Sequence, residues 1–135
     1  MQSFEVYEPK PRIHVVEFVH LRGFGKTFAF MRLSMRLYKL ARELPGYYAG
    51  GIRGKWWSGR FWSYSIWEDH EAMMRFVNSR QHTEAAARIG DFAGPGSCYA
   101  EWVSEDPPNW DEATNRLENP TRYFVPPGIG NPFNR

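Results

Sequence analysis

The sequence predicts an α+β domain in which four strands and two helices follow the order βαββαβ. Three observations support this class. Residues 27–44 carry apolar side chains at helical spacing and stop at a Pro-Gly pair. Residues 13–21 and 61–66 alternate as strands do, and residues 97–104 form a further strand-like run. This order of elements is the ferredoxin-like split arrangement.

The first strand, residues 13–21, has two apolar faces. Ile13, Val15, Glu17, Val19 and Leu21 share one face, and His14, Val16, Phe18 and His20 share the other. Such a strand is usually covered on both sides. Residues 47–57 form a glycine-interrupted second strand, which we expect to turn through Ser58-Gly59 into a third strand over residues 60–67.

The stretch from Phe61 to Ile89 changes from strand to helix at Trp67. Asp69 is a favourable N-cap for a helix whose apolar side chains lie within residues 72–77. Asn78-Ser79 weakens this helix, and we expect a second short helix that contains His82 to follow.

The C-terminal part predicts a short helix over residues 110–117, capped by Asn109, and then a proline-rich tail. We therefore divide the chain into a lead-in (1–12), a ferredoxin-like domain (13–104) and an appendage (105–135) that packs on its own or a partner subunit. Two helices cover only one face of the sheet, so the other face must be buried. We expect a homodimer with a twofold axis to bury it, with the folded-back tail as the alternative.

Composition narrows the class of protein. The chain of 135 residues is long enough for one domain, and it holds no apolar run of transmembrane length and no secretory signal. A single cysteine, Cys98, excludes an internal disulfide and fits a reducing cytoplasm. The net charge of +2 is too small to indicate nucleic-acid binding. Residues 10–42 are nevertheless strongly basic, which we interpret as a solvated face rather than an anion or lipid-headgroup site.

Aromatic residues make up 17% of the chain and include six tryptophans, more than a small core needs. This excess indicates a pocket for a bulky, flat or apolar ligand. No cluster of Cys and His at metal-binding spacing is present, and His14 and His20 lie too far apart along one strand to share an ion. We expect no metal site.

The motif SxWxxxEAMxxFVxSxxH, from Ser65 to His82, resembles the small dimeric α/β-barrel proteins of the antibiotic-biosynthesis-monooxygenase type. Within that superfamily the chain looks closest to an uncharacterised bacterial family allied to spheroidene monooxygenase. The resemblance implies a homodimer with a pocket between sheet and helices in each subunit. Relatives include cofactor-free monooxygenases, haem-dependent enzymes, isomerases and cyclases, so the fold does not fix the chemistry.

The resemblance also implies roles for three residues. Trp67 would line the pocket, Asn78 would orient a substrate oxygen, and His82 would take a proton from a phenol or ligate a haem iron. Each has a structural alternative. Trp67 could hold the corner between strand and helix, Asn78 could end the helix, and His82 could bond to backbone.

We expect the remaining substrate-binding residues to come from the first and third strands, and these are His14, Phe18, Arg60, Trp62 and Tyr64. The leading hypothesis is a small oxygenase-like enzyme acting on an aromatic, polycyclic or isoprenoid molecule in a biosynthetic pathway, with either no cofactor or haem. The alternatives are an isomerase or cyclase that uses the same pocket, and a non-catalytic protein that binds an apolar small molecule.

Overall fold

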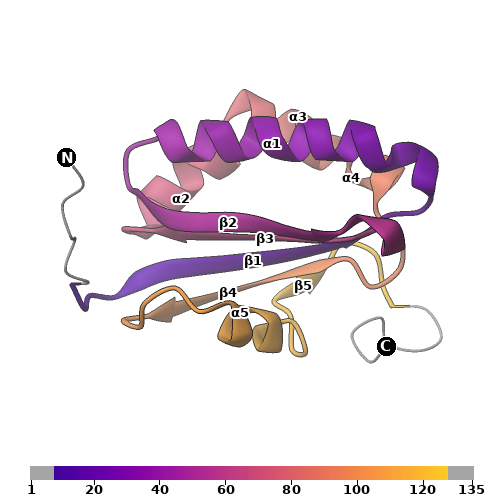
Figure 1. The fold of residues 1–135 in the computed structure, drawn as a ribbon. Helices are drawn as coiled ribbons and strands as arrows, with labels where there is room; N and C mark the ends of the chain where they lie inside the picture. Colours follow the sequence, from indigo (N-terminus) through magenta and orange to yellow (C-terminus); the bar gives the residue numbers. More distant parts are fainter. Residues whose placement is uncertain (1–7, 128–135) are drawn as a thin grey trace, which may run out of the picture.

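The computed structural model describes residues 8–127, which form one antiparallel sheet flanked by helices (Figure 1). The sheet has the strand order β2-β3-β1-β4-β5. Its strands are β1 (Arg12–His20), β2 (Tyr47–Lys55), β3 (Arg60–Trp67), β4 (Cys98–Ser104) and β5 (Arg122–Tyr123). The α-helices are α1 (Thr27–Glu43), α2 (His70–Val77), α3 (Arg80–Ala87), α4 (Ile89–Phe92) and α5 (Trp110–Arg116), and two 3-10 turns are η1 (Phe24–Lys26) and η2 (Trp56–Ser58).

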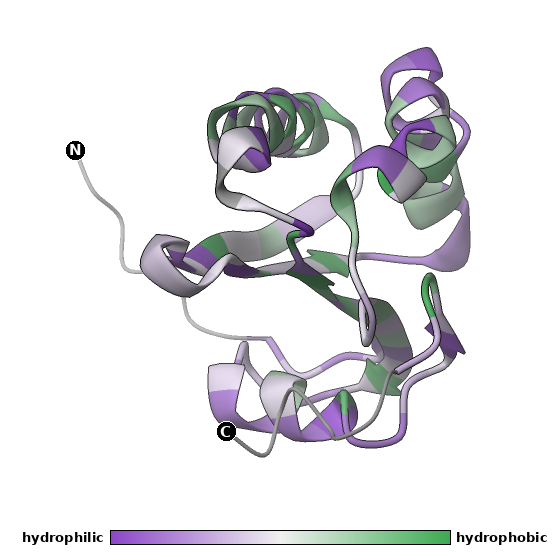
Figure 2. Cartoon of the chain, turned by 90° about the vertical axis from the view of Figure 1, so that its right-hand side faces the viewer, coloured by the Kyte–Doolittle hydropathy of each residue, from purple (hydrophilic) through white to green (hydrophobic). Residues whose placement is uncertain are grey.

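The first four strands have the order of a ferredoxin-like fold, which confirms the predicted α+β class. Helices α1 to α4 lie over one face of the sheet, and α5 lies over the other (Figures 1 and 2). Within the described residues, no helix is both long and apolar enough to cross a bilayer. The parts of the predicted lead-in and tail that fall at residues 1–7 and 128–135 lie outside the described residues.

The corner after α1 depends on Gly46, which has a φ of 89°. A side chain there would be strained, and its Cβ would lie 2.3 Å from the Cβ of Ala72 in α2. The Pro45-Gly46 stop seen in the sequence therefore also lets the start of β2 approach α2 closely.

The predicted break in the second helical region is confirmed. The Asp69 side chain accepts a hydrogen bond from the backbone N–H of Ala72 and begins α2, which ends at Asn78. Ser79 then begins α3, because its Oγ accepts from the backbone N–H of His82 at 3.1 Å and donates to the carbonyl of Phe76 at 2.7 Å. One serine thus ends one helix and starts the next.

The second face of the sheet is covered by the chain's own C-terminal helix. Asn109 caps α5, and Ala113 and Leu117 are fully buried against residues of β1, β3 and β4. The reason we gave for a dimer was that this face needed an outside cover. That reason is corrected, because α5 supplies the cover, and the homodimer stays a proposal.

Two further differences concern strand ends. β2 ends at Lys55 rather than at residue 57, because Trp56–Ser58 forms a 3-10 turn closed by Gly59 at a φ of 70°. The predicted proline-rich tail contains β5, whose Tyr123 and Arg122 pair with Cys98 and Tyr99.

Truncation of the buried α5 anchor tests this packing. We expect Leu117→Ala to lower the free energy of unfolding by about 2–5 kcal/mol, because the side chain is fully buried and leaves a cavity. Urea denaturation measures the change. The control Val103→Ala, on the exposed side of β4, should change it by less than about 0.5 kcal/mol. Equal effects of the two variants would contradict α5 as the cover of this face.

Candidate functional site

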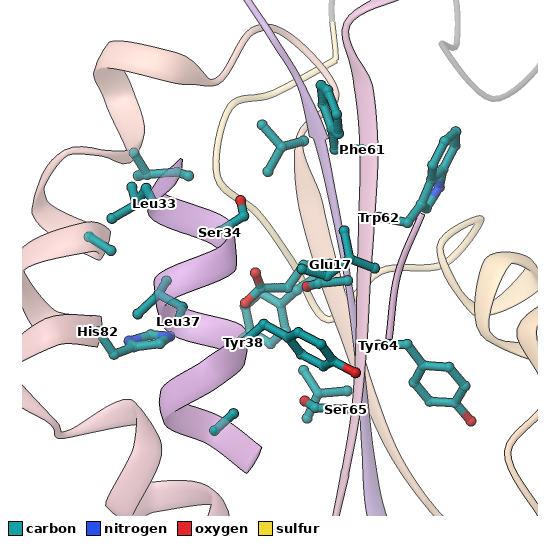
Figure 3. A pocket seen from close by; sticks show the side chains of 18 of the residues that line it. Glu17, Leu33, Ser34, Leu37, Tyr38, Phe61, Trp62, Tyr64, Ser65 and His82 are labelled. Carbon is teal, nitrogen blue, oxygen red and sulfur yellow. The ribbon is translucent and has the colours of Figure 1, made fainter. Parts of the chain in front are cut away.

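A cavity of about 450 Å³ lies between the sheet and the helices that cover it (Figure 3). β1, β2 and β3 form its floor, α1 and α3 form its walls, and the segment around β5 borders one edge. Most of the lining side chains are apolar, among them Val15, Val19, Phe30, Leu33, Leu37, Ile52, Phe61, Phe76 and Ile89. The volume is within the range of pockets that hold small molecules.

Glu17 is the one carboxylate among the described residues that line this cavity. It lies in the middle of β1, between Val15 and Val19 on the face toward the helices, and pairs with Ser63 of β3 and Tyr99 of β4. Burial raises the pKa of Glu17 above 4.5, while the nearby His82 and a hydrogen bond with the Ser63 side chain act against this shift. The carboxyl group is therefore held in a poorly hydrated place that favours its protonated form.

His82 faces the same cavity from the first turn of α3 (Figure 3). Its imidazole meets the ring of Phe76 edge to face, with centroids 4.9 Å apart. Its backbone N–H donates to the Ser79 hydroxyl, and its ring lines the cavity. The fold thus brings an acid from the central strand and a base from a helix to one apolar space.

Trp67 is completely buried and is not among the lining residues. Its indole stacks on Phe76 at 5.3 Å, and its Nε1–H donates to the Ser65 hydroxyl at 3.1 Å. Phe76 in turn contacts His82, so Trp67 acts on the cavity through its neighbours. Asn78 is exposed at the C-terminal end of α2, where its backbone N–H donates to the Met74 carbonyl.

The other five predicted binding residues belong to the opposite face of the sheet, because they occupy even-numbered positions on β1 and β3. These are His14, Phe18, Arg60, Trp62 and Tyr64. Trp62 and Tyr64 are among the residues that line the cavity, which their strand borders, but Figure 3 shows their side chains pointing away from it.

On that opposite face, the Tyr64 hydroxyl lies 2.7 Å from Nδ1 of His14. Burial lowers the pKa of His14, because the charged imidazolium loses its hydration there. The structure therefore separates these residues from Glu17 and His82 by the thickness of the sheet.

Glu17 is the site residue that the sequence analysis missed as a functional group. We placed it on the correct strand face but gave it no role. The signal was present, because a single acidic residue interrupts a run of apolar side chains that faces inward. A carboxylate whose burial is only partly compensated costs stability, which is a reason to expect a function.

The described residues of the cavity lining do not supply the charged groups that a bound haem needs. Haem carries two propionates, and Arg122 is the one arginine or lysine among the described lining residues, whereas Glu17 places a carboxyl group inside the cavity. His82 could supply a ligand nitrogen, but the donor set does not fit haem. Within residues 8–127, no group of three His, Cys, Asp or Glu side chains is placed to hold a metal ion.

The raised pKa of Glu17 predicts a specific pH dependence of stability. A carboxyl group whose pKa is raised on folding stabilises the fold below its unfolded value of 4.5, and this contribution is lost as the pH rises through the folded pKa. We expect Glu17→Gln to remove that loss, so that the variant gains stability over the wild type between about pH 4 and pH 8. Urea denaturation of the wild type and the variant at both pH values measures this difference in the free energy of unfolding.

Glu101→Gln, the same change at an exposed position of β4, serves as the control and should show no such gain. If Glu17→Gln follows the wild-type pH profile, the carboxyl group is not held in a poorly hydrated place.

No protein-family model matches this chain, and no curated protein matches it in sequence. Solved structures do match. Rv0793 from Mycobacterium tuberculosis superposes with a TM-score of 0.63 at 12% identity, over 73% of this chain and 99% of that protein. SnoaB, a cofactor-independent oxygenase from Streptomyces nogalater, gives a TM-score of 0.56 at 15% identity, over 72% of this chain and 95% of SnoaB.

A third structure, described as an antibiotic biosynthesis monooxygenase, gives a TM-score of 0.56 at 14% identity and covers 73% of this chain and 100% of its own. At these identities the likeness is one of fold. The chain therefore has the ferredoxin-like fold of antibiotic-biosynthesis-monooxygenase-like proteins.

Proposed function

We propose that this protein is a small oxygenase-like enzyme that acts on an aromatic or polycyclic molecule by first removing a proton from it. The observation that carries the proposal is the presence of Glu17 and His82 in one cavity whose other walls are mostly apolar. The cavity can exclude water from a flat apolar substrate, and the two ionisable groups can move a proton within it. The fold shared with the oxygenase SnoaB supports the same class.

His82 is the proposed base. A neutral imidazole accepts a proton near physiological pH, and its position at the start of α3 aims the ring across the cavity toward the sheet (Figure 3). Phe76 holds the ring from one side, and Trp67 supports Phe76 from behind. Trp67 is thus a positioning residue, and Asn78 contributes by ending α2 so that α3 can begin.

Glu17 is the proposed partner of the negative charge that develops on the substrate oxygen. Its raised pKa favours a protonated carboxyl group, which can donate a hydrogen bond to an enolate or phenolate. This role replaces the one expected of Asn78 or Arg60, which do not line the cavity. His14, Phe18, Trp62 and Tyr64 support the strands of the floor from the opposite face.

The reaction that fits these roles uses molecular oxygen as the oxidant. His82 takes a proton from an activated methylene or phenol, and the carbanion passes electrons to oxygen to give a hydroperoxide. Loss of water then leaves a carbonyl group, so that one CH₂ and one O₂ become one C=O and one H₂O. We further propose a homodimeric, cytoplasmic enzyme of a biosynthetic pathway.

An isomerase or cyclase is the second candidate, and the placement of an acid and a base in one cavity favours it. In that case the proton removed by His82 returns to another atom of the substrate, with Glu17 again bonded to the oxygen. Oxygen consumption distinguishes the two reactions.

Substitution of both ionisable residues tests the proposal on a panel of anthrones and hydroxylated naphthalenes. We expect His82→Gln to lower turnover by about 10²–10⁴-fold, because the base is lost. Glu17→Gln, which keeps a hydrogen-bond donor, should retain more activity than Glu17→Ala. An oxygen electrode and the absorbance of the quinone product measure turnover.

His70→Gln, the same change at an exposed position outside the cavity, is the control and should react as the wild type does. Hydrogen–deuterium exchange into a substrate without oxygen uptake would favour the isomerase. Binding of the panel without exchange or oxidation, or full activity in His82→Gln, would contradict the proposed enzyme.

A further inference from the structure

Three large aromatic or apolar side chains are exposed at one end of the molecule, outside the cavity. Trp56 and Trp57 form the η2 turn and are 65% and 61% exposed, and Phe28 in the first turn of α1 is 86% exposed. Figure 1 places η2 and the start of α1 at the same end, and Figure 2, which looks onto that end, shows them beside each other. Scattered exposed apolar residues are ordinary, but a group of this size at one end marks an interaction surface.

The same end is basic. The segments 22–32 and 53–60 contain Arg22, Lys26, Arg32, Arg53, Lys55 and Arg60 and no Asp or Glu. Lys55 directly precedes Trp56, and Lys26 lies two residues before Phe28; both lysines are exposed. The ion pairs found within the described residues all involve other parts of the chain. The positive charge around the aromatic side chains is therefore not neutralised by nearby carboxylates.

The outer side of α1 continues this pattern along the helix. Phe28, Arg32, Met35 and Lys39 follow each other at spacings of four, three and four residues, which places them in one stripe. All four are exposed, and Met35 is 50% exposed. The opposite stripe of α1, with Phe30, Leu33 and Leu37, faces the cavity. The helix thus carries cations and large apolar side chains together on its outer side, where the apolar side chains can enter a headgroup layer while the cations contact acidic lipids.

The chemistry of this surface fits an anionic lipid bilayer. Tryptophan prefers the boundary between headgroups and hydrocarbon, and lysine and arginine are attracted to the negative potential of acidic lipids. The two tryptophans lie at the tip of the β2–β3 hairpin, where they can enter the boundary without any rearrangement of the sheet. Such a surface predicts reversible attachment, which is compatible with the absence of a spanning helix from the described residues.

We propose that η2 and the outer side of α1 form a docking surface for anionic membranes. This proposal replaces the interpretation of these basic residues as a solvated face, because exposed aromatic side chains lie on the same segments. Trp56, Trp57 and Phe28 enter the interfacial layer, and Lys26, Lys55 and Arg32 contact the headgroups. This surface is independent of the proposed reaction, because it shares no residue with the cavity wall formed by Phe30, Leu33 and Leu37.

Sedimentation with vesicles tests the docking surface. We expect the full chain to bind vesicles of phosphatidylcholine and phosphatidylserine at least roughly tenfold more strongly than vesicles of phosphatidylcholine alone. Added salt should weaken this binding, because it screens the charge. The double variant Trp56→Ser/Trp57→Ser and the variant Arg32→Gln should each bind less, and the double variant should lose at least about tenfold.

Val103→Ser and Arg80→Gln are matched controls, because they remove an exposed apolar side chain and an exposed cation elsewhere on the surface. Both should bind as the wild type does, and circular dichroism checks that all variants are folded. Equal binding to both kinds of vesicle, no binding, or an equal loss in the controls would overturn the proposal. Size-exclusion chromatography adds a further check. If the wild-type protein is a dimer that does not bind vesicles, and the double variant is a monomer, then the surface binds a second copy of the chain instead.

Discussion

The structure depends on the central strand β1, which is hydrogen-bonded to β3 on one side and β4 on the other. Both of its faces are covered, so each side chain must enter one of two separate apolar spaces. Successive side chains of a strand point to opposite faces, so the position of a residue along β1 decides which of the two spaces its side chain enters. Val15, Glu17 and Val19 enter the cavity beneath α1 and α3, whereas Val16 and Phe18 enter the cluster beneath α5. A shift of one residue in the pairing would exchange these sets and remove Glu17 from the cavity.

Burying the carboxyl group of Glu17 costs free energy, and this cost bears on what the cavity is for. A carboxyl group among apolar side chains loses hydration, and burial raises its pKa as a result. His82 and Ser63 compensate this loss only in part. A residue that destabilises the fold in this way is expected where a reaction or a ligand uses it. The same reasoning does not apply to Cys98, because burial raises its pKa to about 12 and keeps it as an unreactive thiol in the core beneath α5.

The two faces of the sheet therefore have different structural roles. The face under α5 holds an apolar core of rings and aliphatic side chains, with a hollow of about 390 Å³ at its edge beside Lys55, Trp62 and Thr114. The face under α1 and α3 leaves space, because Asn78 and Ser79 end one helix and start another instead of letting a single helix lie along the sheet. The same break sets His82 at the start of α3. Packing under α5 thus holds the strands in place, and the cavity under α1 and α3 is built on those same strands.

Local rules were enough to predict the element types, the Pro-Gly stop after α1, the break at Asn78-Ser79 and the two faces of β1, because each depends on neighbouring residues. They could not predict which face would hold the cavity. Tyr64 and Trp62 do line the cavity, but their side chains point away from it, whereas Glu17, to which we gave no role, faces into it. Alternation within each strand could not reveal this, because the register between β1 and β3 relates their faces. Contacts between segments distant in sequence made that decision. They placed α5 over one face, buried Trp67 behind Phe76, and brought Glu17 and His82 to one space although 65 residues separate them in the chain.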